Sequence, residues 1–110
     1  MAKIATDISQ SKILAEILPL ESADMYYDGF GRLPQGYAYT LISPNSFEYD
    51  IPCWSLVALL GVLPEPYQMT SNKEGKVQLM LIHHLEKDYY DNPVDACVAM
   101  IIKLHELKML

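Results

Sequence analysis

The chain has 110 residues, of which 51% are hydrophobic and 20% are charged, and its formal net charge is −6. This length predicts a single domain over residues 1–110, and the composition excludes a disordered chain. No hydrophobic run approaches the ~20 residues of a membrane span, the N-terminus lacks a signal-peptide pattern, and the basic residues are scattered. We therefore expect a cytoplasmic protein that contacts neither membrane nor nucleic acid directly.

Hydrophobic residues at helical spacing between Ile13 and Leu18 predict a first helix. Ser9 or Ser11 is suited to cap its N-terminus, and Pro19 is expected to end it. Two extended segments are predicted next, at residues 25–27 and 37–42, because both are rich in aromatic or β-branched residues. The glycine-containing segment between them, residues 28–32, is predicted to be a turn.

A second helix is predicted over residues 52–60, with Asp50 as its cap and Pro52 in its first turn. Residues 67–70 and 77–83 then predict a hairpin that turns across residues 72–75. Hydrophobic residues occupy both sides of its second arm. This pattern is typical of a central strand that is covered on both faces.

The last predicted helix begins at Asn92-Pro93 and runs to about Leu107. Its polar side is a narrow stripe, and nearly all of its other residues are hydrophobic. Such a helix is buried on more than one side, either between two layers or at a subunit interface. His105 and Lys108 are suited to complement the negative end of the helix. The stripe consists of Asp95, Ala99, Lys103 and Glu106.

The two helix starts resemble each other when the chain is shifted by 41 residues, so that Tyr49-Asp50-x-Pro52 falls on Tyr90-Asp91-x-Pro93. The match suggests a duplicated unit of two strands and a helix, with halves at residues 25–65 and 66–106. Alternatively, the motif recurs because helix starts favour these residues. We predict an α+β fold in the order αββαββα, with helices packed on one antiparallel sheet and a possible pseudo-twofold repeat.

One part of the chain carries a family resemblance: Cys53-Trp54-Ser55-Leu56-x-Ala58-Leu59-Leu60 with Leu63-Pro64, followed by Asp91-Asn92-Pro93-Val94-Asp95-Ala96-Cys97-x-x-Met100-Ile101. In these motifs the sequence resembles a family of short uncharacterised proteins from gut Bacteroidetes and their phages or mobile elements. The resemblance covers the C-terminal half to two-thirds of the chain. It implies an accessory protein of a phage or mobile element, and it implies no functional residue.

Histidine and carboxylate residues gather after the second arm of the predicted hairpin. Adjacent strand residues point to opposite faces, so His83 and His84 cannot bind one ion together. His84, Glu86 and Asp88 would share a face and could hold a divalent metal ion. The favoured interpretation is the solvated, charged end of a strand, and we predict no metal and no other cofactor.

Cysteine chemistry is the other catalytic alternative. Cys53 lies at the start of the predicted second helix, where the helix dipole would lower its thiol pKa, and His83 or His84 could act as its base. The residues around Cys53 carry no known catalytic motif and are typical of a packing face. Cys97 is predicted to lie in the core. We expect the protein not to be an enzyme.

The eight tyrosines are the most unusual feature of the composition. Tyr37 and Tyr39 share a strand face, and Tyr49 and Tyr90 precede the two predicted helices. Tyrosine is common at protein interfaces, so these four are the predicted interaction residues, although it is also a common strand residue.

Together with the acidic charge, these features predict a non-enzymatic protein-interaction module that binds another protein or itself. The alternatives are an acidic decoy that inhibits a nucleic-acid enzyme, and a small enzyme that depends on a metal or a cysteine.

Overall fold

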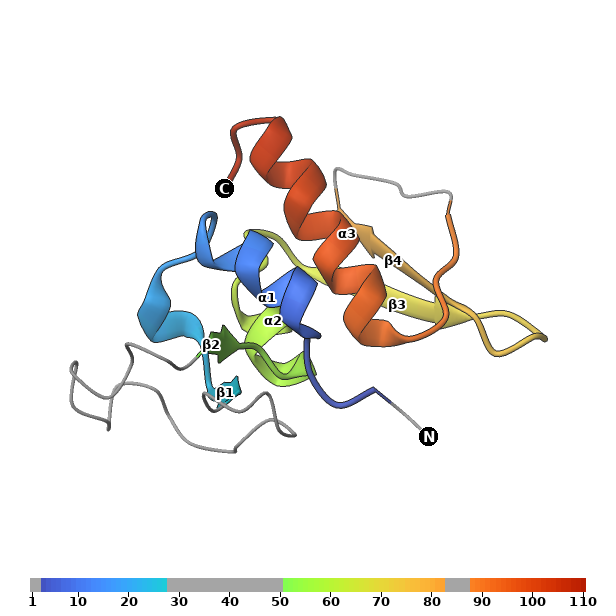
Figure 1. Cartoon of the computed structure of the whole chain (residues 1–110). Helices are drawn as coiled ribbons and strands as arrows, with labels where there is room; N and C mark the ends of the chain where they lie inside the picture. The colour runs from blue at the N-terminus through green and yellow to red at the C-terminus, as the bar shows by residue number, and fades with distance from the viewer. Residues whose placement is uncertain (1–2, 28–50, 83–87) are drawn as a thin grey trace.

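The computed structural model describes residues 3–27, 51–82 and 88–110, which form a small α+β domain. The predicted α+β class is confirmed, and the described elements follow the order αββαββα, with one short 3-10 helix after the first helix (Figure 1). The second strand in this order is formed by residues 51–53. The elements are α1 (Ile8–Ala15), η1 (Leu20–Ser22), β1 (Met25–Tyr27), β2 (Ile51–Cys53), α2 (Leu56–Gly61), β3 (Tyr67–Ser71), β4 (Val77–Leu81) and α3 (Pro93–Glu106). The predicted turn at 28–32 and strand at 37–42 lie outside the described residues.

Helix α1 begins earlier than the sequence pattern indicated. Its N-cap is Asp7, whose side chain accepts a hydrogen bond from the Gln10 backbone N–H at 2.8 Å. The Gln10 side chain in turn accepts a hydrogen bond from the Asp7 N–H at 3.1 Å. This capping box satisfies two N–H groups at once, so the predicted caps Ser9 and Ser11 were wrong. The helix ends at Ala15, before Pro19.

The predicted start of the second helix at Pro52 was also wrong. Residues Ile51–Cys53 form strand β2, which pairs with β1 in antiparallel register, with Pro52 opposite Tyr26. Helix α2 starts at Leu56 because Ser55 is its cap and accepts a hydrogen bond from the Ala58 N–H at 3.3 Å. Asp24 fixes this cap, since its carboxylate accepts hydrogen bonds from both the backbone N–H and the hydroxyl of Ser55.

The predicted hairpin is confirmed as β3 and β4, which pair in antiparallel register from Tyr67 opposite Leu81 to Ser71 opposite Val77. Its turn is stabilised by the Asn72 side chain, which accepts hydrogen bonds from two backbone N–H groups. Gly75 has a φ of 81°, a backbone conformation that glycine adopts without strain.

The expected single four-stranded sheet is not what the described ranges form. They form two separate two-stranded sheets, β1 with β2 and β3 with β4. Strand β4 was predicted to be covered on both faces, but only one face is fully buried. Val77, Leu79 and Leu81 are buried, whereas Gln78 and Met80 on the other face are half-buried.

Helix α3 confirms the most strongly predicted element. Asn92 caps it by accepting a hydrogen bond from the Asp95 N–H at 2.8 Å, and Pro93 occupies the first turn. The helix packs against β4, α2 and α1 of the same chain, as Figure 1 shows, so its hydrophobic circumference lies between layers and needs no subunit interface. Its buried residues are Val94, Ala96, Cys97, Val98, Met100, Ile101 and Leu104.

The internal repeat stays a prediction because Tyr49 and Asp50 lie outside the described residues. Where the motif is described, the two copies differ: Pro52 lies in a strand and Pro93 in the first turn of a helix. Among the described residues, no helix has the length and hydrophobicity needed to cross a membrane.

Candidate functional site

The direction of the backbone hydrogen bonds in the hairpin distinguishes the two sides of β3. The Asn72 N–H donates to the Lys76 carbonyl at 2.9 Å, and the Ile82 N–H donates to the Pro66 carbonyl at 3.3 Å. Because bonded pairs alternate along an antiparallel ladder, the even-numbered residues of β3 point their backbone groups toward β4. The backbone groups of Tyr67, Met69 and Ser71 therefore point away from β4.

The two outer edges of the hairpin differ. On the β4 side, Val77 and Tyr90 exchange two backbone hydrogen bonds of 2.7 Å each, so the chain itself begins to cover that edge. On the β3 side, no residue in the described ranges bonds to the outward backbone groups of Tyr67, Met69 or Ser71. The edge of β3 is therefore open within the described part of the chain.

This open edge lacks the usual protection against strand pairing. Folded proteins block exposed edges with charged residues, prolines or bulges. The β3 segment, Tyr-Gln-Met-Thr-Ser, has no charge and no proline, and its register with β4 runs without a bulge. Tyr67 is 47% exposed, and Ser71 at the other end of the strand is exposed as well.

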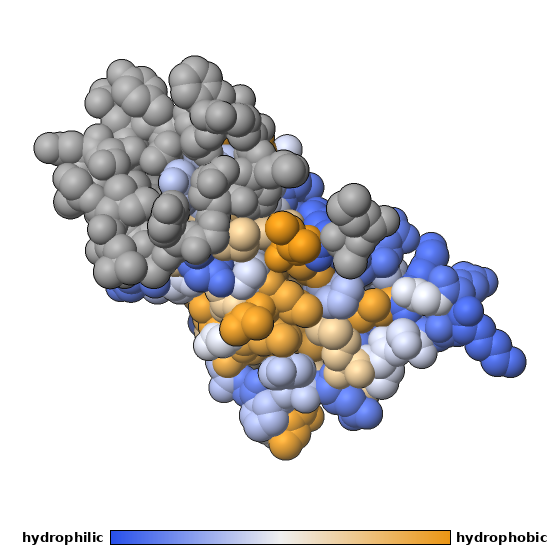
Figure 2. All heavy atoms as spheres, turned by 90° about the horizontal axis from the view of Figure 1, so that it is seen from below, coloured by the Kyte–Doolittle hydropathy of each residue, from blue (hydrophilic) through white to orange (hydrophobic). Residues whose placement is uncertain are grey.

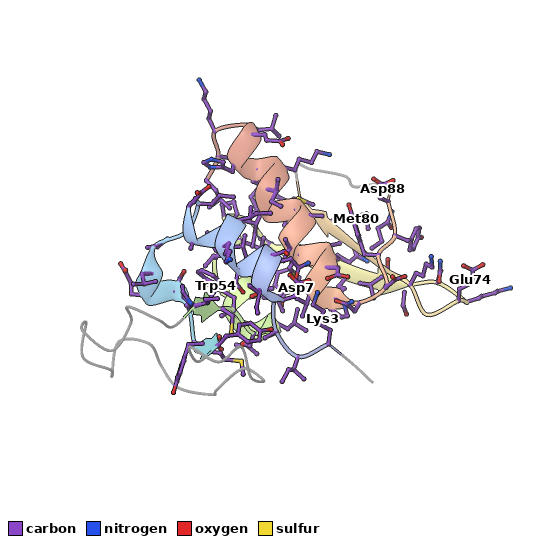
Figure 3. The ribbon with its side chains drawn as sticks, in the orientation of Figure 1. Lys3, Asp7, Trp54, Glu74, Met80 and Asp88 are labelled. Atoms are coloured by element: carbon purple, nitrogen blue, oxygen red, sulfur yellow. The ribbon has the colours of Figure 1, made fainter. Side chains whose placement is uncertain are left out.

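A shallow concavity of about 320 Å³ lies at the base of the hairpin, where β3 begins and β4 ends. Two of its hydrophobic side chains are strongly exposed, Tyr67 at 47% and Ile82 at 65%. Figure 3 shows the side chain of Met80, another lining residue, on β4. The concavity is lined by Pro66, Tyr67, Gln68, Met80, Leu81 and Ile82.

A separate hydrophobic surface lies on the underside of the domain. Figure 2 shows hydrophobic side chains gathered in the middle of this face and hydrophilic ones toward the tip of the hairpin. Two large hydrophobic residues outside the hairpin are strongly exposed, Val57 on α2 at 78% and Ile4 at 61%. An isolated bridge between Ala5 and Ser55 places the N-terminal segment beside the start of α2.

Of the four predicted interaction tyrosines, Tyr90 lies within the described residues. Tyr37, Tyr39 and Tyr49 lie outside the described residues. Tyr90 is half-buried and packs against the core, and its backbone pairs with Val77. The structure thus gives Tyr90 a place beside the edge of β4.

Of the residues considered for a metal site, Asp88 lies within the described residues. His83, His84 and Glu86 lie outside the described residues, and Asp88 is exposed on the segment that leads to α3 (Figure 3). Within the described ranges, no group of three histidine, cysteine, aspartate or glutamate side chains is placed to hold a metal ion.

Cys53 does not occupy the helix start that would activate its thiol. It is fully buried in β2, and burial, together with the nearby charge of Asp24, raises the pKa of the Cys53 thiol to about 12. Burial likewise raises the pKa of the Cys97 thiol to about 12, and Cys97 lies in the core as predicted. Both thiols are therefore protonated at neutral pH, which disfavours them as nucleophiles.

A polar cluster joins the N-terminal segment to the start of α3. The Lys3 ammonium group donates to Asp95 at 2.8 Å and to Asp7 at 3.2 Å, and the Gln10 amide also donates to Asp95, at 2.9 Å. Figure 3 shows Lys3 and Asp7 together below α3. Burial acts to raise the pKa of Asp95, but the hydrogen bonds from Lys3 and Gln10 outweigh it and lower this pKa.

The Asp95→Asn variant tests the strength of this cluster. The lowered pKa means that the Asp95 charge stabilises the fold above its ordinary pKa near 3.8, and that this contribution is lost as the pH falls through the lower folded value. We expect the variant to lose about 0.5–1 kcal/mol at pH 7, with a smaller loss at pH 3, in urea denaturation. Asp91→Asn is the control. The Asp91 side chain is 80% exposed and its Oδ1 lies 3.8 Å from the Lys76 Nζ, so this ion pair should contribute little to stability. An equal loss at both pH values would contradict the assignment.

Sequence reasoning located the hairpin but missed its open edge as a site. The turn across residues 72–75 fixes the register, and the register fixes which residues point outward, so this information was present in the pattern. What the sequence did not show is whether another strand covers β3. Comparisons of the chain with protein-family models, curated proteins and solved structures give no significant match.

Proposed function

We propose that this protein is a small non-enzymatic protein-interaction module, which binds an extended segment of a protein partner along the open edge of β3. The observation that carries the proposal is the row of outward backbone groups on Tyr67, Met69 and Ser71. An extended segment that pairs with such an edge gains main-chain hydrogen bonds, and neighbouring pockets select its side chains.

Each backbone hydrogen bond contributes a net free energy of about 0.5–1.5 kcal/mol, so the edge alone supports modest affinity. The concavity at the base of the hairpin adds hydrophobic contact, because Tyr67 and Ile82 are exposed there. The net charge of −6 favours encounter with neutral or basic segments over acidic ones. The protonated thiols of Cys53 and Cys97 support a binding role over cysteine chemistry.

The biological context of this interaction is inferred from the sequence alone. The family resemblance supports an accessory role in a phage or mobile element.

The Ser71→Pro variant tests the function. The Ser71 N–H points away from β4, so proline removes an outward donor without removing a hydrogen bond of the hairpin. We expect affinity purification of the tagged wild type from its native cell to retain a specific partner, and the proline variant to lose it.

Two further variants make this result specific. Ser71→Ala keeps the N–H and should retain the partner. Val57→Ser alters the hydrophobic surface on α2 and should also retain it. If the Ser71→Pro variant kept the partner while the Val57→Ser variant lost it, the binding surface would be α2, and the proposal for β3 would be wrong.

A further inference from the structure

We infer that the extended segment bound by β3 is the β3 strand of a second copy of this chain, so that two hairpins join into one four-stranded antiparallel sheet. The inference rests on the proposed function, because both use the same open edge. It goes further by naming the occupant and its register.

The spacing of the outward groups makes β3 complementary to itself. If a twofold axis passes beside Met69, then Met69 faces Met69 of the second copy, and Tyr67 faces Ser71 of the second copy. Every residue in these pairs points its N–H and C=O outward, so each N–H meets a C=O of the other copy. A twofold axis beside Gln68 or Thr70 would instead bring together residues whose backbone groups are already bonded to β4.

The charges near the edge fit the same register. Strand β3 carries no charge, so no like charges face each other in its centre. Continued past the strand ends, the register brings Lys73, in the turn, near Glu65 of the second copy, which precedes its β3. Each dimer would contain this opposite-charge contact twice, as expected for a twofold interface.

The concavity also fits this arrangement. In an antiparallel pair, the hairpin tip of one copy lies beside the hairpin base of the other. The turn residues 72–75 of the second copy would therefore lie next to the concavity formed by Pro66, Tyr67 and Ile82. This contact would extend the interface beyond the backbone pairing and cover exposed hydrophobic side chains.

The first test is light scattering after size exclusion at high micromolar concentration. We expect the wild type and Ser71→Ala to form dimers, and Ser71→Pro to raise the dissociation constant of the dimer by about tenfold or more. Lys73→Glu and Glu65→Lys should each weaken the dimer, and the two changes combined should restore it, because the double variant recreates the opposite-charge contact.

The second test fixes the register by disulfide trapping with glutathione disulfide as the oxidant. In a Met69→Cys variant, the two new thiols would face each other across the axis with Cα atoms about 5.5 Å apart, which suits a disulfide. Each disulfide would form with loss of two protons and transfer of two electrons to the oxidant. Ser71→Cys should not cross-link, because residue 71 faces residue 67 of the second copy. The native cysteines are buried and should not interfere.

A strict monomer at high micromolar concentration would overturn this inference. So would a dimer that Ser71→Pro leaves intact, or cross-linking at position 71 in place of position 69. The proposed function fails separately: if the chain is monomeric but Ser71→Pro loses its captured partner, the edge binds a different protein and only the self-pairing is wrong.

Discussion

Replacing Trp54 with alanine is expected to lower the free energy of unfolding by about 3–5 kcal/mol, the usual range when a buried aromatic side chain is removed. The side chain is fully buried and lies in the main hydrophobic cluster beneath α1 (Figure 3). Its indole N–H donates to the Ser22 hydroxyl at 2.9 Å. The substitution therefore removes packing contacts within this cluster, which includes Leu14 of α1 and Leu59 of α2, and leaves a cavity.

Urea denaturation followed by far-UV circular dichroism measures this loss, since the variant has no tryptophan fluorescence. Two control variants separate the contribution of packing from that of the indole hydrogen bond. Trp54→Phe keeps most of the packing and should lose clearly less, whereas Ser22→Ala removes only the partner of the indole N–H and should cost about 1 kcal/mol. A loss below about 1 kcal/mol for Trp54→Ala would show that this side chain does not support the core.

The Thr6→Val variant is expected to lose about 1–3 kcal/mol, although valine has nearly the shape of threonine. The Thr6 hydroxyl is buried, accepts a hydrogen bond from the Trp54 backbone N–H at 3.1 Å, and is bonded to the Ser11 hydroxyl at 2.8 Å. Valine leaves both of these buried groups without a partner. An unsatisfied buried polar group costs more than the net value of the bond it made.

A double-variant cycle with Ser11→Ala tests this explanation, with stability measured by urea denaturation and the fluorescence of Trp54. Ser11→Ala removes one of the two stranded groups, so the combined variant should lose less than the sum of the two single losses. Fully additive losses would contradict a direct bond between the two hydroxyls. The Thr6 N–H, which donates to the Trp54 carbonyl at 3.0 Å, is unchanged in every variant.

Elements that are specified by local signals could be predicted from the sequence. The cap Asn92 and the first-turn residue Pro93 determine the start of α3 within a few residues of chain. The hairpin depends on its own turn, where Asn72 and Gly75 supply the bonding and the backbone geometry. Neither element needs a distant partner to define its position.

The sequence predictions were wrong where residues far away in the sequence determine the local structure. Pro52 is typical of a helix start, but pairing with Tyr26 holds it in a strand. Asp24, 31 residues before Ser55, fixes the true cap of α2. The same error misplaced Cys53, which was expected at a helix dipole and lies in a buried strand with a raised thiol pKa.

The candidate site at the edge of β3 depends both on the register of the hairpin and on the packing of the rest of the chain. The turn register could have shown that Tyr67, Met69 and Ser71 share one side of β3. Whether that side is open depends on how the rest of the chain packs, and no pattern within β3 contains this information. Within residues 3–27, 51–82 and 88–110, the two separate sheets leave the edge of β3 without a pairing strand.

Amide hydrogen exchange, followed by NMR, tests the central claim most directly. In dilute solution, the amides of Gln68 and Thr70 should be protected by β4, whereas those of Tyr67, Met69 and Ser71 should exchange rapidly. When concentration or a captured partner fills the edge, the three outward amides should become protected, and the Gln68 and Thr70 amides should change little. Outward amides that are already protected in the dilute monomer, or that stay unprotected in the complex, would contradict binding at the edge of β3.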